Sequence, residues 1–402
     1  MKKTITRIII MLLVLMAATM LFTGCDDPPP EEPTATAIVI GNHANSYALN
    51  LSIPDMVSAV ARSAANGYIS VIVADGKPAL VSADLYSIPK QYQGADARKL
   101  EADARHRAAN ILAGLSEVRA QAPELDTLEA LWQAARSFAA VPEITQREII
   151  VIDTGLSTTG TLDFRNNLLG ADPDVIADLL DERVAIPELT GITVRWFQLG
   201  DVAPPQPALT YGQVAQLKNI WTAIIEKRGG TVVFSDMAPA QQANDPAEYP
   251  EISVVKLPPE TSLFFDPVNV TVFDEKQVRF IGDTAEYVDP GAAAAALRPA
   301  ADYIMAHPRF IALLVGTTAS GNRARCLKLS EDRAGAVRDT LVSIGVPGEQ
   351  LITLGLGFEN DPWHIPDTDS GGNWIEALAS QNRKVLLMDA NSPVAQAILD
   401  SV

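Results

Sequence analysis

The chain has 402 residues, of which 31 are Lys or Arg and 49 are Asp or Glu, so its formal net charge is −18. So acidic a protein has no broad basic face for nucleic acid or for anionic lipid headgroups, and the sequence predicts neither as a partner of that kind. The length suits two domains. Only two cysteines are present, which excludes a fold held together by several disulfides.

The first residues, 1–24, predict a lipoprotein signal peptide. A basic start, MKKTITR, precedes an apolar stretch that ends in a small-residue pair, and Cys25 follows directly. This arrangement resembles a bacterial lipobox, with Phe22 where leucine is usual, and the resemblance implies cleavage before Cys25 and a lipid such as palmitate at that residue. The alternative is an uncleaved membrane anchor, for which the apolar stretch falls just short of the ~18 residues that a span needs. Both interpretations place the rest of the chain at the cell membrane or outer membrane, facing the periplasm or the cell exterior.

The next segment, 25–36, has the sequence CDDPPPEEPTAT, which is typical of an acidic, Pro-rich, extended tether. If Cys25 carries the lipid, Cys326 has no partner for an intramolecular disulfide. We therefore expect Cys326 to be a small buried apolar side chain, and the stability of the protein to come from its hydrophobic cores.

Residues 37–239 predict an N-terminal, doubly wound α/β domain with a mostly parallel sheet. Short runs rich in β-branched residues alternate with longer helical segments. The runs are almost wholly apolar, as expected for a sheet that is covered on both faces. The predicted strands are 37–41, 69–74, 147–153, 192–200 and 231–235. The predicted helices are 54–65, 95–121, 124–140, 172–183 and 210–228.

Two polar loops follow predicted strands, GNHANS at 41–46 and DTGLSTTG at 153–160. In a doubly wound fold such loops meet at one edge of the sheet, where ligands bind. The second loop loosely resembles the D-x-S-x-S motif of von Willebrand A-type domains, with a glycine in its middle position. The resemblance implies a divalent-cation site made by Asp153, Ser157 and Thr159. The alternative is a loop that is held by its own Ser and Thr hydroxyl groups.

The D-T-G at the start of that loop is also the motif of aspartic proteases, which need two carboxylates that share one proton. No second D-T-G or D-S-G is present, and long Ala-rich helical segments surround this one. The four histidines show no metal-binding spacing, and the chain lacks a nucleophile elbow, a phosphate-binding loop and a CxxC pair. The sequence therefore predicts a non-enzymatic protein that needs no cofactor.

The segment 240–272 is rich in Pro and polar residues and predicts a linker, with one short strand at 252–257. Residues 273–390 predict an α+β sandwich with helices on one face of the sheet, and 391–402 a C-terminal tail. The predicted elements are strands at 276–281, 310–316, 350–356 and 382–388 and helices at 290–306 and 328–344.

The second of these helices carries clear end signals. Ser330 is a good N-cap, and Gly345 and Pro347 end the helix and prevent its continuation. Arg333 would then lie in the first turn, where a cation opposes the helix dipole and a ligand carboxylate would relieve the conflict.

The motifs of this region resemble those of the OmpA C-terminal-like domain, shared with peptidoglycan-associated lipoproteins and flagellar stator proteins. They are V-G-T-T after the second strand, L-S-x-x-R-A at 329–334, G-V-P at 345–347 and N-R-K-V at 382–385, and they fall in order within 273–390. The resemblance implies a domain that binds the peptide stem of peptidoglycan. It implies contacts from Arg333, Thr317, Thr318, Asn382 and Arg383.

One motif departs from the family. Members usually have G-H-T-D-x-x-G after the second strand, and its Asp works with the Arg of L-S-x-x-R-A to hold the amine and carboxylate of diaminopimelate. Here residues 316–321 read GTTASG, without the His and the Asp. Three outcomes stay open: weaker binding, a different peptide, or a carboxylate from the insert 359–374. The candidate carboxylates of that insert are Asp361, Asp367 and Asp369.

Taken together, the sequence predicts a lipid-anchored envelope protein that binds peptidoglycan non-covalently, with an unidentified protein partner or ligand at the N-terminal domain. The alternative is a metal-dependent adhesion protein or envelope enzyme that acts through the N-terminal domain, with a degenerate OmpA-like anchor.

Overall fold

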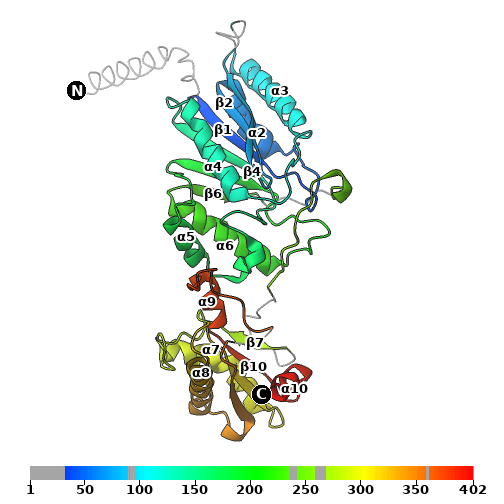
Figure 1. Cartoon of the computed structure of the whole chain (residues 1–402). Helices are drawn as coiled ribbons and strands as arrows, with labels where there is room; N and C mark the ends of the chain where they lie inside the picture. The colour runs from blue at the N-terminus through cyan, green and yellow to red at the C-terminus, as the bar shows by residue number, and fades with distance from the viewer. Residues whose placement is uncertain are drawn as a thin grey trace, which may run out of the picture.

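The computed structural model describes residues 32–401, except 89, 91–95, 236–241, 259–268 and 359–361. A larger α/β domain is followed by a smaller domain that begins at Thr271 (Figure 1). The predicted signal peptide and Cys25 lie outside the described residues. Within the described ranges, no helix is both long enough and apolar enough to cross a membrane.

The first domain is built on a six-stranded sheet of order β3-β2-β1-β4-β5-β6. All neighbouring strands are parallel except β3, which is antiparallel to β2 at one edge. The five predicted strands are confirmed, and β3 is an addition. The strands are β1 (Thr34–Ile40), β2 (Gly67–Val73), β3 (Ala79–Tyr86), β4 (Gln146–Ile152), β5 (Ile192–Phe197) and β6 (Thr231–Phe234).

Helices cover both faces of this sheet, because alternate strand residues point to opposite sides. On one face α2 and α3 pack against residues such as Ile38 and Ile150. On the other face α4, α5 and α6 pack against residues such as Val39 and Val151. The five predicted helices are confirmed. They are α2 (Pro54–Ala65), α3 (Ala97–Leu115), α4 (Thr127–Ser137), α5 (Pro173–Glu182) and α6 (Tyr211–Lys227).

The second domain has a four-stranded sheet of order β7-β10-β8-β9. Helices α7 and α8 pack on one face, and α10 packs on the other through Ala395 and Ile398. The strands are β7 (Thr271–Phe273), β8 (Ala312–Gly316), β9 (Leu351–Gly355) and β10 (Val385–Asp389). The helices are α7 (Pro290–Ala306), α8 (Arg323–Ser343), α9 (Glu376–Asn382) and α10 (Pro393–Asp400).

Five details of the sequence analysis are wrong. The first strand of the second sheet is β7, and only Phe280 of the segment 276–281 makes a bridge, to Tyr287. The segment 252–257 forms no strand. Helices lie on both faces of the second sheet, because most of the expected tail forms α10. Cys326 is partly rather than fully buried.

The fifth error concerns the start of α8. The helix begins at Arg323, and the side chain of Asn322 caps it by accepting a hydrogen bond from the backbone N–H of Arg325. Ser330 therefore lies inside the helix, where its hydroxyl donates to the Leu327 carbonyl and accepts from the Gly357 N–H. Arg333 is consequently far from the helix N-terminus, and the expected conflict with the helix dipole does not arise.

Candidate functional site

The polar edge of the α/β domain lies where the strand order reverses, between β1 and β4. At this position a doubly wound sheet leaves room for a ligand. The loops after the two strands meet there, as expected. His43 Nε2 lies 3.4 Å from Asp153 Oδ1, and the hydroxyl of Thr127 donates to Asp153 Oδ2 over 2.5 Å. The Asp153 carboxylate also fills the space above Gly41, where a Cβ would lie 2.4 Å from Oδ1.

The hydroxyl groups of the second loop hold it onto the start of α4. Ser157 Oγ accepts from the Thr127 N–H over 3.1 Å, and Thr158 Oγ1 accepts from the Leu125 N–H over 3.0 Å. Ser157 and Asp153 are buried, and Thr159 is partly exposed. In the part of the chain that the structure describes, no group of three or more His, Cys, Asp or Glu side chains is placed to hold a metal. The cation site at Asp153, Ser157 and Thr159 stays a prediction.

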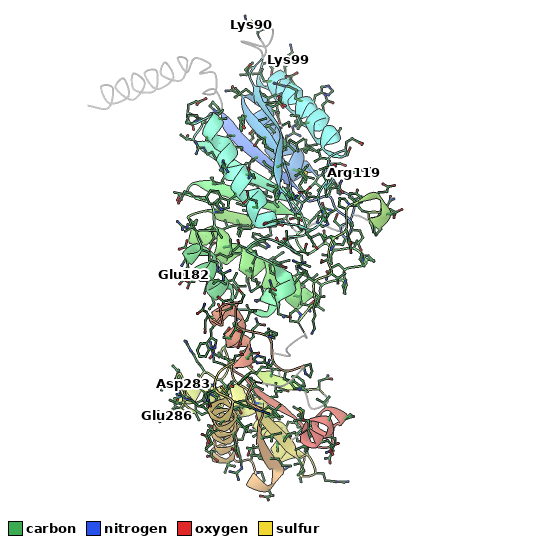
Figure 2. The ribbon with its side chains drawn as sticks, viewed as in Figure 1. Lys90, Lys99, Arg119, Glu182, Asp283 and Glu286 are labelled. Atoms are coloured by element: carbon green, nitrogen blue, oxygen red, sulfur yellow. The ribbon has the colours of Figure 1, made fainter. Side chains whose placement is uncertain are left out.

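A segment of the expected linker covers this edge. The side-chain amide of Asn244 donates to Asn42 Oδ1, to the His43 carbonyl and to Ser46 Oγ, at 2.9, 2.9 and 3.1 Å. The Tyr249 hydroxyl donates to Asn42 Oδ1 over 3.1 Å. Figure 2 shows Arg119 beside the same segment, where it forms an ion pair with Glu248. Residues 242–249 are thus part of the α/β domain.

These contacts give Asp153 a structural role that can be measured. We expect Asp153→Ala to lower the free energy of unfolding of the α/β domain by about 1–3 kcal/mol, because the Thr127 hydroxyl and His43 lose a buried acceptor. Urea denaturation checks this, with Thr159→Ala as a control that should change stability little. Two results together would instead support the cation site. Asp153→Ala would lower the free energy of unfolding only when Ca²⁺ or Mg²⁺ is present, and a chelator would lower that of the unmodified protein.

The second candidate site surrounds the loop after β8. Thr317 donates its hydroxyl to the Asn382 carbonyl over 2.6 Å and its N–H to the Lys384 carbonyl over 3.0 Å. The N–H of Thr318 donates to the Gly357 carbonyl, and its buried hydroxyl has no hydrogen-bond partner among the described residues. The structure therefore brings three of the predicted site residues together at this loop.

The insert before α9 places a carboxylate against this loop. Asp367 is fully buried, and its Oδ2 accepts from the Ser320 N–H over 3.0 Å and from Asn382 Nδ2 over 2.9 Å. Its Oδ1 is buried without a hydrogen-bond partner in the described structure. Asp369, by contrast, is exposed and accepts from its own turn at Gly371 and Asn373. Asp361 lies outside the described residues.

His364 and Ser320 lie beside Asp367, yet the three do not form a catalytic triad. Ser320 Oγ is 3.3 Å from His364 Nε2, and Asp367 Oδ1 is 3.9 Å from the same nitrogen. A triad needs the nucleophile and the carboxylate on different nitrogens of the imidazole, and His364 Nδ1 has no partner among the described residues. Burial lowers the pKa of His364, although the negative charge of Asp367 opposes the shift.

Arg333 provides the cation of this region, from the middle of α8. It is 3% exposed, its Nε donates to the Thr284 carbonyl over 3.0 Å, and its guanidinium lies 5.0 Å from the centre of the Phe280 ring. No carboxylate among the described residues comes within ion-pair distance of it. Burial lowers the pKa of Arg333, against the attraction of Glu275.

The neighbouring cations are placed differently. Arg383 pairs with Glu275 over 2.6 Å and also with Glu376. Burial disfavours its charge, but these hydrogen bonds outweigh burial and raise its pKa. Burial lowers the pKa of Lys384 to about 8, although Asp274 opposes the shift. Arg383 is thus already neutralised, whereas Arg333 is not.

Sequence reasoning missed the acidic partner of Arg383. Glu275 follows shortly after β7, which begins inside the predicted linker 240–272, so the sequence does not indicate its position at the edge of the sheet. The signal that could have found it is the alternating sequence VNVTV at 268–272, shortly before it.

Residues 288–371 match the model of the OmpA family. No curated protein matches the chain. Among solved structures, the peptidoglycan-associated lipoprotein from Burkholderia pseudomallei is 30% identical over 27% of this chain and 86% of that one, with a TM-score of 0.23. The OmpA-like domain of FopA1 from Francisella tularensis is 20% identical over 31% and 81%, with a TM-score of 0.22. The periplasmic domain of Helicobacter pylori MotB is 16% identical over 34% and 87%, with a TM-score of 0.25.

Proposed function

We propose that this chain, whose residues 288–371 match the model of the OmpA family, is a non-enzymatic envelope protein that binds the peptide stem of peptidoglycan without a covalent bond. The bound group is a diaminopimelate residue, whose side chain ends in a carboxylate and an ammonium on one carbon. A site for such a group needs one cation and one anion, each lacking a strong partner of its own.

The observation that carries this proposal is the state of two buried charges. Arg333 is 3% exposed and has no carboxylate within ion-pair distance in the described structure. Asp367 is fully buried, with one carboxylate oxygen that receives no hydrogen bond from any described residue. A buried charge without a partner costs several kcal/mol, and a zwitterionic ligand would remove part of that cost from both groups.

In this proposal Arg333 holds the ligand carboxylate, and Asp367 replaces the missing family Asp by accepting from the ligand ammonium. The insert thus supplies from another part of the chain what the sequence GTTASG lacks. Thr317 and Asn382 position the loop and the carboxylate, and Arg383 neutralises Glu275. We expect a rotation of the His364 side chain, which is 16% exposed, to open Asp367 Oδ1 to the ligand.

The proposed location rests on the lipobox-like sequence that precedes Cys25. We propose that Cys25 carries the lipid, that the acidic tether spaces the folded part from the membrane, and that the C-terminal domain holds the cell wall. In this arrangement the α/β domain is available to bind a protein partner.

Calorimetric titration of the full chain with a tripeptide stem that ends in meso-diaminopimelate tests the site. We expect Asp367→Asn to weaken binding by roughly 10- to 100-fold, because a charge-assisted hydrogen bond contributes about 1.5–3 kcal/mol. The substitution preserves the shape of the side chain, and its amide oxygen can still accept from the Ser320 N–H.

Asp369→Asn is the matched control, since that carboxylate is exposed and bonds only to its own turn. A second peptide, with the side-chain carboxylate of diaminopimelate amidated, should bind more weakly than the first. Equal affinity for both peptides, or no effect of Asp367→Asn, would contradict the proposed site.

A further inference from the structure

We infer that the α/β domain positions the carboxylate of the proposed peptidoglycan site, and that it does so through helix α9, with Leu378 and Asn382 as positioning residues. The inference rests on the proposed function, because it concerns the same site. It adds that wall binding and the docking of the α/β domain are linked in one molecule.

One side of α9 belongs to the core of the other domain. Ala377 and Leu378 are buried in the same apolar cluster as Leu169, Ile176 and Leu180 of the α/β domain. The partly buried Ile365 and Ile375, from the insert before α9, pack against this cluster. In Figure 1, α9 lies directly below α5 and α6, between the two domains. The insert and α9 are therefore anchored on the α/β domain by apolar contacts.

Polar contacts fix the same docking. Gln381 Nε2 donates to the Asn167 carbonyl over 3.3 Å. The end of that side chain occupies the space beside Gly170, where a Cβ would lie 2.5 Å from Gln381 Oε1. Across the same junction Lys276 Nζ lies 3.5 Å from Asp172 Oδ2. Figure 2 shows Glu182, the last residue of α5, on the part of the α/β domain nearest to the C-terminal domain.

The C-terminal end of α9 holds the ligand site. Asn382 is fully buried; its Nδ2 donates to Asp367 Oδ2 over 2.9 Å and to the Ile365 carbonyl over 2.7 Å. Its Oδ1 accepts from the Ile365 N–H over 2.8 Å, and its carbonyl accepts from the Thr317 hydroxyl. A single residue thus fixes the insert, the carboxylate and the loop after β8.

Two consequences follow from this connection. If α9 shifts on the α/β domain, Asn382 and Ile365 shift with it, and Asp367 leaves the position in which it can accept from a ligand ammonium. Because binding linkage is reciprocal, a ligand at Asp367 also strengthens the docking of α9 on α5. Force or a partner that acts on the α/β domain would in this way change the hold on the cell wall.

The test is a double-mutant cycle in the full chain, with the diaminopimelate tripeptide as probe. We expect Leu378→Ala to weaken binding about tenfold, a typical coupling between two sites. In an Asp367→Asn background the same substitution should cause no further loss, because the residue through which it acts is already neutral. A general loss of stability would not produce that dependence on Asp367.

Leu131→Ala is the matched control, since Leu131 is also buried in the same apolar cluster but lies on α4, away from α9. It should leave tripeptide affinity unchanged. Gln381→Ala provides a milder change at the junction and should weaken binding in the same direction. Amide hydrogen exchange should also slow in α5 when the tripeptide binds.

Two results would overturn the inference while leaving the proposed function standing. One is normal binding by Leu378→Ala together with weak binding by Asp367→Asn. The other is an equal loss of tripeptide affinity when Leu378→Ala is introduced into the unmodified chain and into the Asp367→Asn variant. If Asp367→Asn itself binds normally, the proposed site fails first, and the two failures are thereby distinguished.

Discussion

Replacement of Arg333 by Met should reduce binding of the full chain to peptidoglycan sacculi by roughly 10- to 100-fold, because a charge-assisted contact to the ligand carboxylate is lost. The same replacement should leave the thermal stability of the C-terminal domain unchanged or raise it. The replacement loses the hydrogen bond to the Thr284 carbonyl and the contact with the Phe280 ring, but it also removes the desolvation cost of a buried charge that has no carboxylate partner among the described residues. Co-sedimentation and thermal unfolding check the two parts.

Arg338→Met is a suitable control, because Arg338 lies on the same helix, its side chain is 41% exposed and it pairs with its neighbour Asp339. It should bind sacculi as the unmodified chain does. Strong destabilisation by Arg333→Met with normal sacculus binding would show that Arg333 has a structural role only. That outcome would remove the cation from the proposed site.

Replacement of Gly316 by Ala should destabilise the C-terminal domain by roughly 3 kcal/mol or more. A Cβ at this position would lie 1.9 Å from the backbone oxygen of Ser330, so α8 could no longer pack closely on the end of β8. Since α8 carries Arg333 and Gly316 begins the loop with Thr317, peptidoglycan binding should fall as well. Urea denaturation measures the first effect and sacculus co-sedimentation the second.

Gly335→Ala separates this steric effect from glycine replacement in general. Gly335 lies within α8 with nothing within 4 Å of its added Cβ, so alanine should stabilise the helix by about 0.5–1 kcal/mol. Opposite signs for the two variants are expected. If Gly316→Ala is as stable as the unmodified chain, the close contact between α8 and β8 is not required for this fold.

The buried strands could be predicted because continuous apolar runs leave few alternatives to a covered parallel sheet. β3 could not, because all but its last residue are exposed and its sequence, ALVSADLY, carries no clear pattern. The start of α8 was placed too late for a similar reason. Its first turns read RARCLKL, with little apolar periodicity, and Ser330 offered a more familiar capping signal than Asn322.

The candidate site could be predicted only where a local motif marks it. Thr317 and Asn382 lie in such motifs, and the structure places the Thr317 hydroxyl 2.6 Å from the Asn382 backbone carbonyl. Asp367 could be named only as one of three candidate Asp residues in the insert, because its position depends on Asn382 and on contacts far along the chain. Helix α9 is seven residues long and packs on the other domain, so neither its existence nor its role could be read from local sequence.

The D-T-G loop also shows that a short motif does not by itself predict the role of its residues. Asp153 holds the Thr127 hydroxyl and faces His43 in a buried cluster, and residues 242–249 cover that edge of the sheet. The sequence had placed the second loop beside the first correctly, because the strand order follows from the alternation of strands and helices. It had no means of showing that part of the expected linker would fold back over the first loop.

The most direct measurement of the central claim is a crystal structure of the full chain with the diaminopimelate tripeptide. We predict that the side-chain carboxylate of the ligand lies within hydrogen-bond distance of the Arg333 guanidinium, and that its ammonium lies next to Asp367 Oδ1. A ligand bound elsewhere, or bound with its ammonium away from Asp367, would contradict the account.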